Sequence, residues 1–306
     1  MTRAWRKTGL LYTPEGALRR HPKLLTHAAN PLAVHMKEDI FRIFYSGRDS
    51  NNRSSVGAVD IDIVQKRVIT DHFEPFFEHG PTNSFYADGI SIGNCYTVGG
   101  ITYMLFMGWQ ANPTAHWRGD IGRFVVTPEL TLRLDQNEPF ISSDKHDPIS
   151  LSYPWVMAHQ GGLFSMWYGS TISWTSENKE MIHVINFASS SDGHLWRKHG
   201  LAVPYELGKA QAFSRPTVVQ TGQSDYEMWF SYRSGLGTTY RIGHAYSKDG
   251  SNWRLSLETT GIDISSNGWD SEMIEYPFVF DHGGQRYMLY NGNGYGKTGF
   301  GLAIQG

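Results

Sequence analysis

Acidic side chains stand at two points where an apolar run of the sequence begins. Asp88 precedes one such run, and Glu272 and Glu275 precede another near the C-terminus. Two carboxyl groups that face one small space can divide the work of acid and base, because a water-poor environment raises the pKa of one of them. We therefore name Asp88 and Glu275, together with Glu272, as candidate catalytic residues. The alternative is that these acids cap strand ends or pair with Arg215.

Arginines and polar residues occupy equivalent points before other apolar runs. Arg215 offers a guanidinium fork to a carboxylate, a phosphate or sugar hydroxyls, and Arg48 and Arg233 lie in loops that could converge with it. If these arginines are not used in ion pairs with Glu275 or Asp88, the ligand is expected to be anionic. The other candidate ligand-binding residues near the same strand starts and ends are His27, Asn30, Tyr153, Tyr276 and Asn291.

Tryptophans supply a possible platform for a sugar ring. Trp109, Trp117 and Trp174 lie in long polar segments, where packing between sheets is the alternative role, whereas Trp167 and Trp229 lie in apolar strands and are expected in the core. The sequence has no His-x-His or His-Glu-x-x-His spacing, so we expect no zinc site. No cofactor-binding motif is recognised either, and no cofactor is expected.

A repeat of about 61 residues positions these candidates. Each copy has an apolar strand that usually begins at proline, a turn, and a second strand rich in Tyr, Met and Trp that ends at a small residue. Gly47, Gly108 and Gly169 mark this small residue 61 residues apart, and Gly292 follows after two further periods. Repeats of this length made of short strands are typical of propeller blades with four strands each.

The sequence therefore predicts an all-β fold, a five-bladed β-propeller of four-stranded antiparallel blades in a single domain over residues 1–306. The segment Trp5-Arg-Lys-Thr-Gly-Leu10 closely repeats Trp196-Arg-Lys-His-Gly-Leu201, which falls where the outer strand of the third blade is expected. We expect the N-terminal strand to join the last blade and close the ring, because that edge would otherwise carry unpaired backbone groups.

The two faces of such a ring differ in their loops. Asp192 and Asp249 lie in Ser-x-Asp-Gly turns between third and fourth strands, and we expect them to be structural, since Asp-Gly is a common hairpin signal. The longer polar and aromatic loops share the opposite face with the starts of the inner strands. That face is where the candidate residues are predicted to meet.

Strand starts of the types Asn30-Pro, Tyr153-Pro, Arg215-Pro and Tyr276-Pro in five repeats resemble the furanosidase-type glycoside hydrolases, the arabinanase, levansucrase and invertase superfamily. The resemblance covers the whole chain and implies a glycoside-hydrolase-like enzyme that hydrolyses or transfers a glycosyl group. The acids of that superfamily do not carry over. Asn30 stands where the first aspartate is expected, and serine-tyrosine and serine-arginine pairs stand at the other two positions.

Three functions therefore stay open. The first is glycosyl hydrolysis or transfer on an anionic carbohydrate. The second is a propeller recruited to polysaccharide or secondary-metabolite biosynthesis with non-hydrolytic chemistry, and the third is glycan binding without catalysis. A small molecule or oligosaccharide is the expected partner in each, and the sequence does not give the oligomeric state.

Composition excludes several other classes. The 27 Lys and Arg against 29 Asp and Glu leave a formal charge of −2, and no basic run provides a nucleic-acid footprint. No apolar run is long enough to predict a membrane span. The single Cys95 excludes an intramolecular disulfide, and the N-terminal residues lack the apolar segment of a secretory signal, so a cytoplasmic protein is expected.

Overall fold

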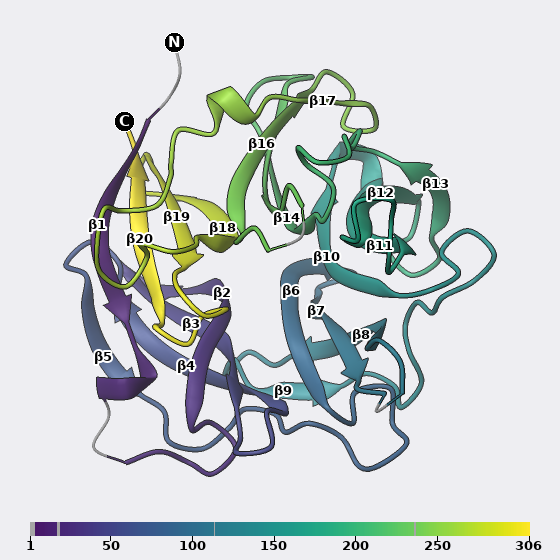
Figure 1. The fold of residues 1–306 in the computed structure, drawn as a ribbon. Coiled ribbons are helices and arrows are strands. Elements are labelled where there is room, and N and C mark those ends of the chain that lie inside the picture. The colour runs from purple at the N-terminus through teal and green to yellow at the C-terminus, as the bar shows by residue number, and fades with distance from the viewer. Residues whose placement is uncertain (1–3, 17–18, 113, 236) are drawn as a thin grey trace.

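The computed structural model describes residues 4–16, 19–112, 114–235 and 237–306, and the regular secondary structure in this part of the chain is almost entirely β-strand (Figure 1). The all-β prediction is confirmed. The strands are β1 (Trp5–Tyr12), β2 (Thr26–Lys37), β3 (Ile40–Arg48), β4 (Ser54–Asp62), β5 (Arg67–Asp71), β6 (Gly89–Val98), β7 (Ile101–Gln110), β8 (Arg118–Val126), β9 (Leu132–Leu134), β10 (Leu151–Ala158), β11 (Phe164–Ser173), β12 (Ile182–Ser190), β13 (Arg197–Leu201), β14 (Ser214–Gln220), β15 (Tyr226–Tyr232), β16 (Arg241–Ser247), β17 (Trp253–Leu255), β18 (Glu275–His282), β19 (Gln285–Asn291) and β20 (Phe300–Gln305). Three 3₁₀ turns accompany them, η1 (Pro14–Gly16), η2 (Gln160–Gly162) and η3 (Leu257–Thr259).

Antiparallel sheets of four strands follow one another along the chain. Three have the orders β10-β11-β12-β13, β14-β15-β16-β17 and β1-β20-β19-β18. An eight-stranded sheet contains β2 to β5 and β6 to β9, which are joined by a single parallel pair, Ser54 with Gly89. In the third sheet β1 pairs with β20, with Trp5 opposite Gln305, so the two ends of the chain share one sheet.

The sheets surround a common centre, as in a β-propeller (Figure 1). The strands β2, β6, β10, β14 and β18 lie nearest the centre, and each contacts the next in cyclic order, with β18 contacting β2. Large apolar side chains of the second strands fill the space between sheets. Phe44, Phe106, Trp167 and Phe230 are fully buried there, and Trp229 is nearly so, as expected for strand tryptophans.

A backbone bulge recurs at the start of four central strands. Asn30, Tyr153, Arg215 and Tyr276 each have a positive φ, between 38° and 54°, and each is followed by proline. The ladder skips these residues, for example between the pairs Ser152–Gly169 and Trp155–Trp167. Because a bulged residue is released from the strand's alternation, its side chain can be directed toward the ring centre.

The small residue of the repeat is required by packing. A Cβ atom at Gly169 would collide with the Ser152 hydroxyl and with the His183 ring, and one at Gly292 would collide with Trp269. The periodic glycines that mark the repeat in the sequence therefore mark close approaches between neighbouring strands and loops.

Candidate functional site

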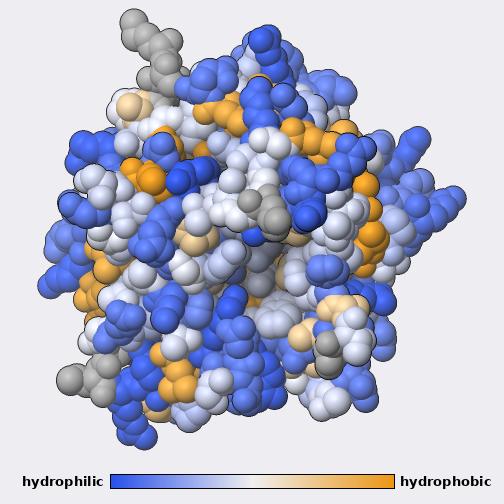
Figure 2. Space-filling model, in the orientation of Figure 1, coloured by the Kyte–Doolittle hydropathy of each residue, from blue (hydrophilic) through white to orange (hydrophobic). Residues whose placement is uncertain are grey.

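A cavity of about 480 Å³ lies on the face that carries the loops between second and third strands. Figure 2 shows this face, which is hollowed near the centre where the innermost strands meet in Figure 1. Of the residues predicted from the sequence, those that line the cavity are Arg48, Trp109, Trp117, Tyr153, Trp174, Arg233 and Tyr276. A larger depression of about 810 Å³ between the β10 and β14 sheets is lined by none of the candidate residues.

Aromatic rings form one wall of the cavity. Trp117 and Trp174 meet edge to face with their ring centroids 4.9 Å apart, and His116 stacks on Trp174 at 4.6 Å. The Trp109 indole donates a hydrogen bond to the Ser54 hydroxyl, which fixes the ring at the start of β6. Rings held in this way, and still partly exposed, offer flat apolar surfaces to a ligand.

Tyrosines form the deeper part of the cavity. The rings of Tyr153 and Tyr276 lie 5.4 Å apart, and their hydroxyl oxygens are 3.4 Å apart. The guanidinium of Arg233 lies over the Tyr240 ring, with its Cζ atom 4.9 Å from the ring centroid. Burial raises the pKa of all three tyrosines, so their hydroxyls stay protonated and can both donate and accept hydrogen bonds.

Glu275 lies behind this tyrosine layer. It has no exposed surface, and neither carboxyl oxygen has a hydrogen-bond partner among the described residues. Burial raises the pKa of Glu275 well above its usual value, while the cavity arginines Arg48 and Arg233 oppose the shift. A carboxyl in these surroundings favours its protonated form, as a general acid requires.

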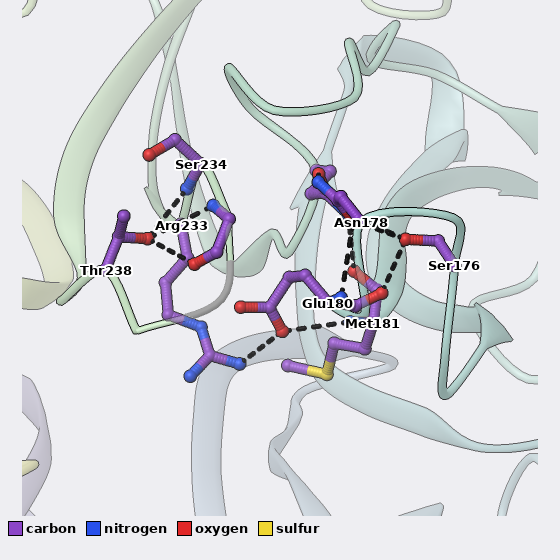
Figure 3. Close-up of polar contacts among 9 residues, drawn as sticks. Ser176, Asn178, Glu180, Met181, Arg233, Ser234 and Thr238 are labelled. Atoms are coloured by element: carbon purple, nitrogen blue, oxygen red, sulfur yellow. Dashed lines mark hydrogen bonds and ion pairs between the residues drawn. The ribbon is translucent and has the colours of Figure 1, made fainter.

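Glu180 is the only carboxylate among the described residues that line the cavity. Its Oε1 accepts a hydrogen bond from Arg233 Nη2 at 2.8 Å and another from the Met181 backbone N–H at 2.9 Å. Figure 3 shows the two side chains pointing toward each other from separate loops, one before β12 and one after β15. The sequence analysis missed Glu180, which follows directly on the polar loop that carries Trp174.

Arg215 lies on the ring axis and does not line the cavity. Its guanidinium donates to the carbonyl oxygens of residues in three other central strands: Asn30 and Pro31 in β2, Ile92 in β6, and Tyr276 and Pro277 in β18. All five N–H groups are used, and no ion pair with a carboxylate is found within the described residues. Burial lowers the pKa of Arg215 to about 9. Arg215 therefore links four central strands through hydrogen bonds and has no N–H group left to donate to a ligand.

Two other predicted residues support the cavity from behind. Asn291 accepts a hydrogen bond from the Asn30 backbone N–H and donates to the carbonyls of Ala28 and Gly299. Asn30 is buried, and its side-chain oxygen has no partner among the described residues. Both asparagines therefore lie at the junction of β2 and β19, outside the cavity lining.

The remaining predicted residues lie away from the cavity lining. Asp88 is partly exposed and accepts a hydrogen bond from the Ala111 backbone N–H at 2.7 Å. Glu272 is exposed, and its backbone rather than its carboxylate bonds to neighbouring loops. His27 is hydrogen-bonded to Thr26, and burial, with the nearby Arg48, lowers its pKa to about 4.

The position expected for Asp88 is instead filled by Ser91. In β10, Tyr153 follows the residue paired with Gly169, and in β6 the residue that follows the partner of Gly108 is Ser91. Ser91 lines the cavity. Because β6 lacks the proline and has its bulge further along the strand, the sequence pattern placed the wrong residue at the ring centre.

Further residues complete the cavity that sequence reasoning did not select. Lys179, Tyr240 and Tyr295 lie in its lining together with Glu180. His183 is held between the hydroxyls of Ser152 and Thr171, at 2.6 and 2.7 Å, and burial lowers its pKa to about 4, so it is neutral.

Within the described residues, no group of three or more His, Cys, Asp or Glu could hold a metal ion. The described chain also contains no helix long and apolar enough to cross a bilayer.

Solved structures with the same fold include glycoside hydrolases. One described as a glycoside hydrolase superposes with a TM-score of 0.73 at 14% identity, covering 99% of this chain and 92% of that one. A glycosyl hydrolase from Bacteroides ovatus gives 0.72 at 11% identity over 99% of this chain and 94% of that one. A structure from the GH130 family, described as mannoside phosphorylases and hydrolases of beta-1,2 mannosidic linkages, gives 0.69 at 11% identity with the same coverage.

Sequence relatives are found in Mycobacterium tuberculosis, and no family model matches the chain. "Uncharacterized protein MT1551" of strain CDC 1551 / Oshkosh and "Uncharacterized protein Rv1502" of strain ATCC 25618 / H37Rv are each 41% identical over 303 residues, covering 98% of this chain and 99% of theirs. The predicted resemblance to the furanosidase-type propellers is confirmed at the level of the fold. The chain belongs to the family of these two mycobacterial proteins, and that family has the fold of the glycoside hydrolase propellers.

Proposed function

We propose that the cavity is the active site of a glycoside-hydrolase-like enzyme that hydrolyses or transfers a glycosyl group on an anionic carbohydrate. The observation that carries the proposal is that one small cavity combines aromatic walls, a lining carboxylate and a second, buried carboxyl directly behind it. Trp117 and Trp174 would stack on the sugar, while Tyr153 and Tyr276 would bind its hydroxyls. The glycoside hydrolase fold of the solved neighbours supports this choice of chemistry.

Glu275 and Glu180 are the proposed catalytic pair. Glu275, whose pKa is raised by burial, would donate its proton to the glycosidic oxygen as the bond to the anomeric carbon breaks. Glu180 would accept a proton from the water or sugar hydroxyl whose oxygen forms the new bond to that carbon. The products are then the free alcohol and a hydrolysed or transferred sugar, and proton return from Glu180 to Glu275 through solvent completes the cycle.

The proposed anionic character of the substrate follows from the charges in the cavity. Arg48, Lys179 and Arg233 line it, against the single lining carboxylate of Glu180. Neither Arg48 nor Lys179 forms an ion pair within the part of the chain that the structure describes. Uncompensated cations in a partly dry pocket favour a ligand that carries a carboxylate or a phosphate.

The proposed architecture is a single five-bladed domain over residues 1–306. The two halves of the eight-stranded sheet count as separate blades, since one pair of residues joins them. In this proposal β1 closes the ring by supplying the outer strand of the last blade, and its pairing with β20 supports the assignment.

A turnover assay with matched variants tests the function. Glu275→Gln and Glu180→Gln should each lower the rate of product release from a panel of acidic oligosaccharides about 10²-fold or more, as loss of a general acid or base does. Glu177→Gln is the control, because Glu177 is an exposed acid on the same loop. A larger loss in Asp88→Asn than in Glu180→Gln would contradict the proposed pair.

Glycan binding without catalysis is the second candidate, and one observation favours it. Glu275 has no exposed surface, so its proton reaches a ligand only if the tyrosine layer shifts. Saturable binding of an acidic oligosaccharide, with unchanged ligand recovered after long incubation, would select this function over the enzymatic one.

A further inference from the structure

The Arg233–Glu180 ion pair crosses between two loops at the cavity. Arg233 follows β15, while Glu180 precedes β12 in the neighbouring sheet, and both side chains line the cavity. Their 2.8 Å contact is the only ion pair recorded for either residue within the described chain. It is therefore a contact between sheets that a ligand entering the cavity would meet directly (Figure 3).

Arg233 has hydrogen-bonding capacity that the protein does not use. Its Nε is buried and has no partner among the described residues, and one nitrogen, Nη2, makes its bond to Glu180. This contrasts with Arg215, whose five N–H groups all have acceptors. A buried donor without an acceptor is unfavourable, so an anion that reaches the guanidinium gains more than the one bond it replaces.

The backbone of Glu180 is anchored independently of the bond between its carboxylate and Arg233. Its carbonyl accepts from the Ser176 backbone N–H and hydroxyl at 2.9 and 2.7 Å, and its N–H donates to the Asn178 side chain at 3.3 Å. Gln211 ties Asn178 to the next sheet. Apart from Arg233, the carboxylate is bonded only to the adjacent Met181 backbone N–H among the described residues, so it can leave Arg233 by side-chain rotation at the cost of that one bond while the loop stays in place.

We propose that the anionic group of the substrate replaces Glu180 on Arg233 and thereby releases the Glu180 carboxylate into the cavity. One part of this inference rests on the proposed function, namely that the released Glu180 carboxylate acts as the proton acceptor of the catalytic pair. In the free protein Glu180 occupies the anion site and is withheld from chemistry. A substrate that carries a carboxylate or phosphate exposes it, whereas a neutral sugar leaves it paired.

The exchange is tested by measuring ligand affinity in two variants, Glu180→Gln and Arg233→Gln, for which changes of opposite sign are expected. The probes are inorganic phosphate, glucose 6-phosphate, glucuronate and neutral glucose, titrated by calorimetry at constant ionic strength. If Glu180 competes with the anion, Glu180→Gln should tighten binding of an anionic probe about tenfold while it lowers turnover. Arg233→Gln should weaken the same probe about tenfold or more, and glucose affinity should not move with either change.

Controls separate exchange from simple loss of structure. Glu177→Gln removes one negative charge from the same exposed loop without releasing Arg233, and anion affinity should be unchanged. Arg233→Lys keeps the charge but loses the fork, so it should fall between wild type and Arg233→Gln. Melting temperatures identify any variant that fails to fold, and Glu180→Asp then replaces Glu180→Gln, because its shorter side chain weakens the pair.

The outcomes discriminate between the two proposals. Equal or weaker anion binding in a folded Glu180→Gln or Glu180→Asp variant, or no binding of any anionic probe to wild type, overturns the exchange. If turnover still depends on Glu180 and Glu275 in that case, the proposed function stands alone. Opposed affinity changes without any turnover would retain the exchange and refute the catalytic function. Preference for phosphate probes over glucuronate, or the reverse, identifies the anionic group.

Discussion

Removing the guanidinium on the ring axis is expected to destabilise the whole protein. Arg215→Met deletes five hydrogen bonds to carbonyls of three other central strands, and two of them are 2.8 Å long. A hydrogen bond to a charged group contributes about 1.5–3 kcal/mol, so the two short bonds alone predict a loss of about 4 kcal/mol. With an unfolding entropy of about 2.1 cal/mol/K per residue over 306 residues, this corresponds to a melting temperature lower by about 6 °C.

Urea unfolding followed by tryptophan fluorescence measures this loss. Arg67→Met serves as the control, since Arg67 lies on the exposed strand β5 and forms no ion pair within the described chain. Arg215→Lys should recover part of the stability because it keeps the charge with fewer donors. A loss below about 1 kcal/mol for Arg215→Met, typical of a surface site, would refute the structural role and return Arg215 to the candidate ligand-binding residues.

Three further outcomes are expected. Glu275 binds its proton more tightly when folded than when unfolded, so its contribution to stability is lost as the pH rises above about 4.5; the stability of wild type relative to Glu275→Gln should therefore fall when the urea midpoints of the two proteins are compared from pH 4 to 8, and a constant difference would contradict the raised pKa. Gly169→Ala should lower the free energy of unfolding by about 1–3 kcal/mol, because the new methyl collides with Ser152 and the His183 ring; an unchanged midpoint would show that the strands can move apart. Trp117→Ala should weaken oligosaccharide binding about tenfold at unchanged melting temperature, and equal affinity in a titration would remove Trp117 from the binding wall.

The repeat carried most of the fold prediction. Gly47, Gly108 and Gly169 keep their spacing because each meets side chains of a neighbouring segment, so the same packing constraint recurs in each repeat. The N-terminal segment was assigned to the last sheet because it resembles another outer strand, and β1 does pair with β20 there. The spacing of the repeat and the similarity of its strands can be read from the sequence directly, and they were sufficient to predict the sheets.

The site was only partly predictable. The three tryptophans of the cavity (Trp109, Trp117 and Trp174) and Arg233 could be found because the long loops after second strands share one face. Asp88 was misplaced because β6 starts without proline and bulges later, which shifts Ser91 into the ring. The use of Arg215 by backbone carbonyls leaves no trace in the sequence, since every strand supplies carbonyl oxygens whatever its side chains are.

At four positions before proline, the central strands keep the same left-handed backbone conformation although the side chains differ. Asn30, Tyr153, Arg215 and Tyr276 share one backbone conformation yet present an amide, two phenols and a guanidinium. A left-handed conformation is costly for tyrosine and arginine, although asparagine tolerates it, so at Tyr153, Arg215 and Tyr276 the surrounding strands must impose it. If the cavity binds the proposed sugar, substitutions at Tyr153 and Tyr276 would therefore change the groups presented to it while the backbone of the ring stays as it is.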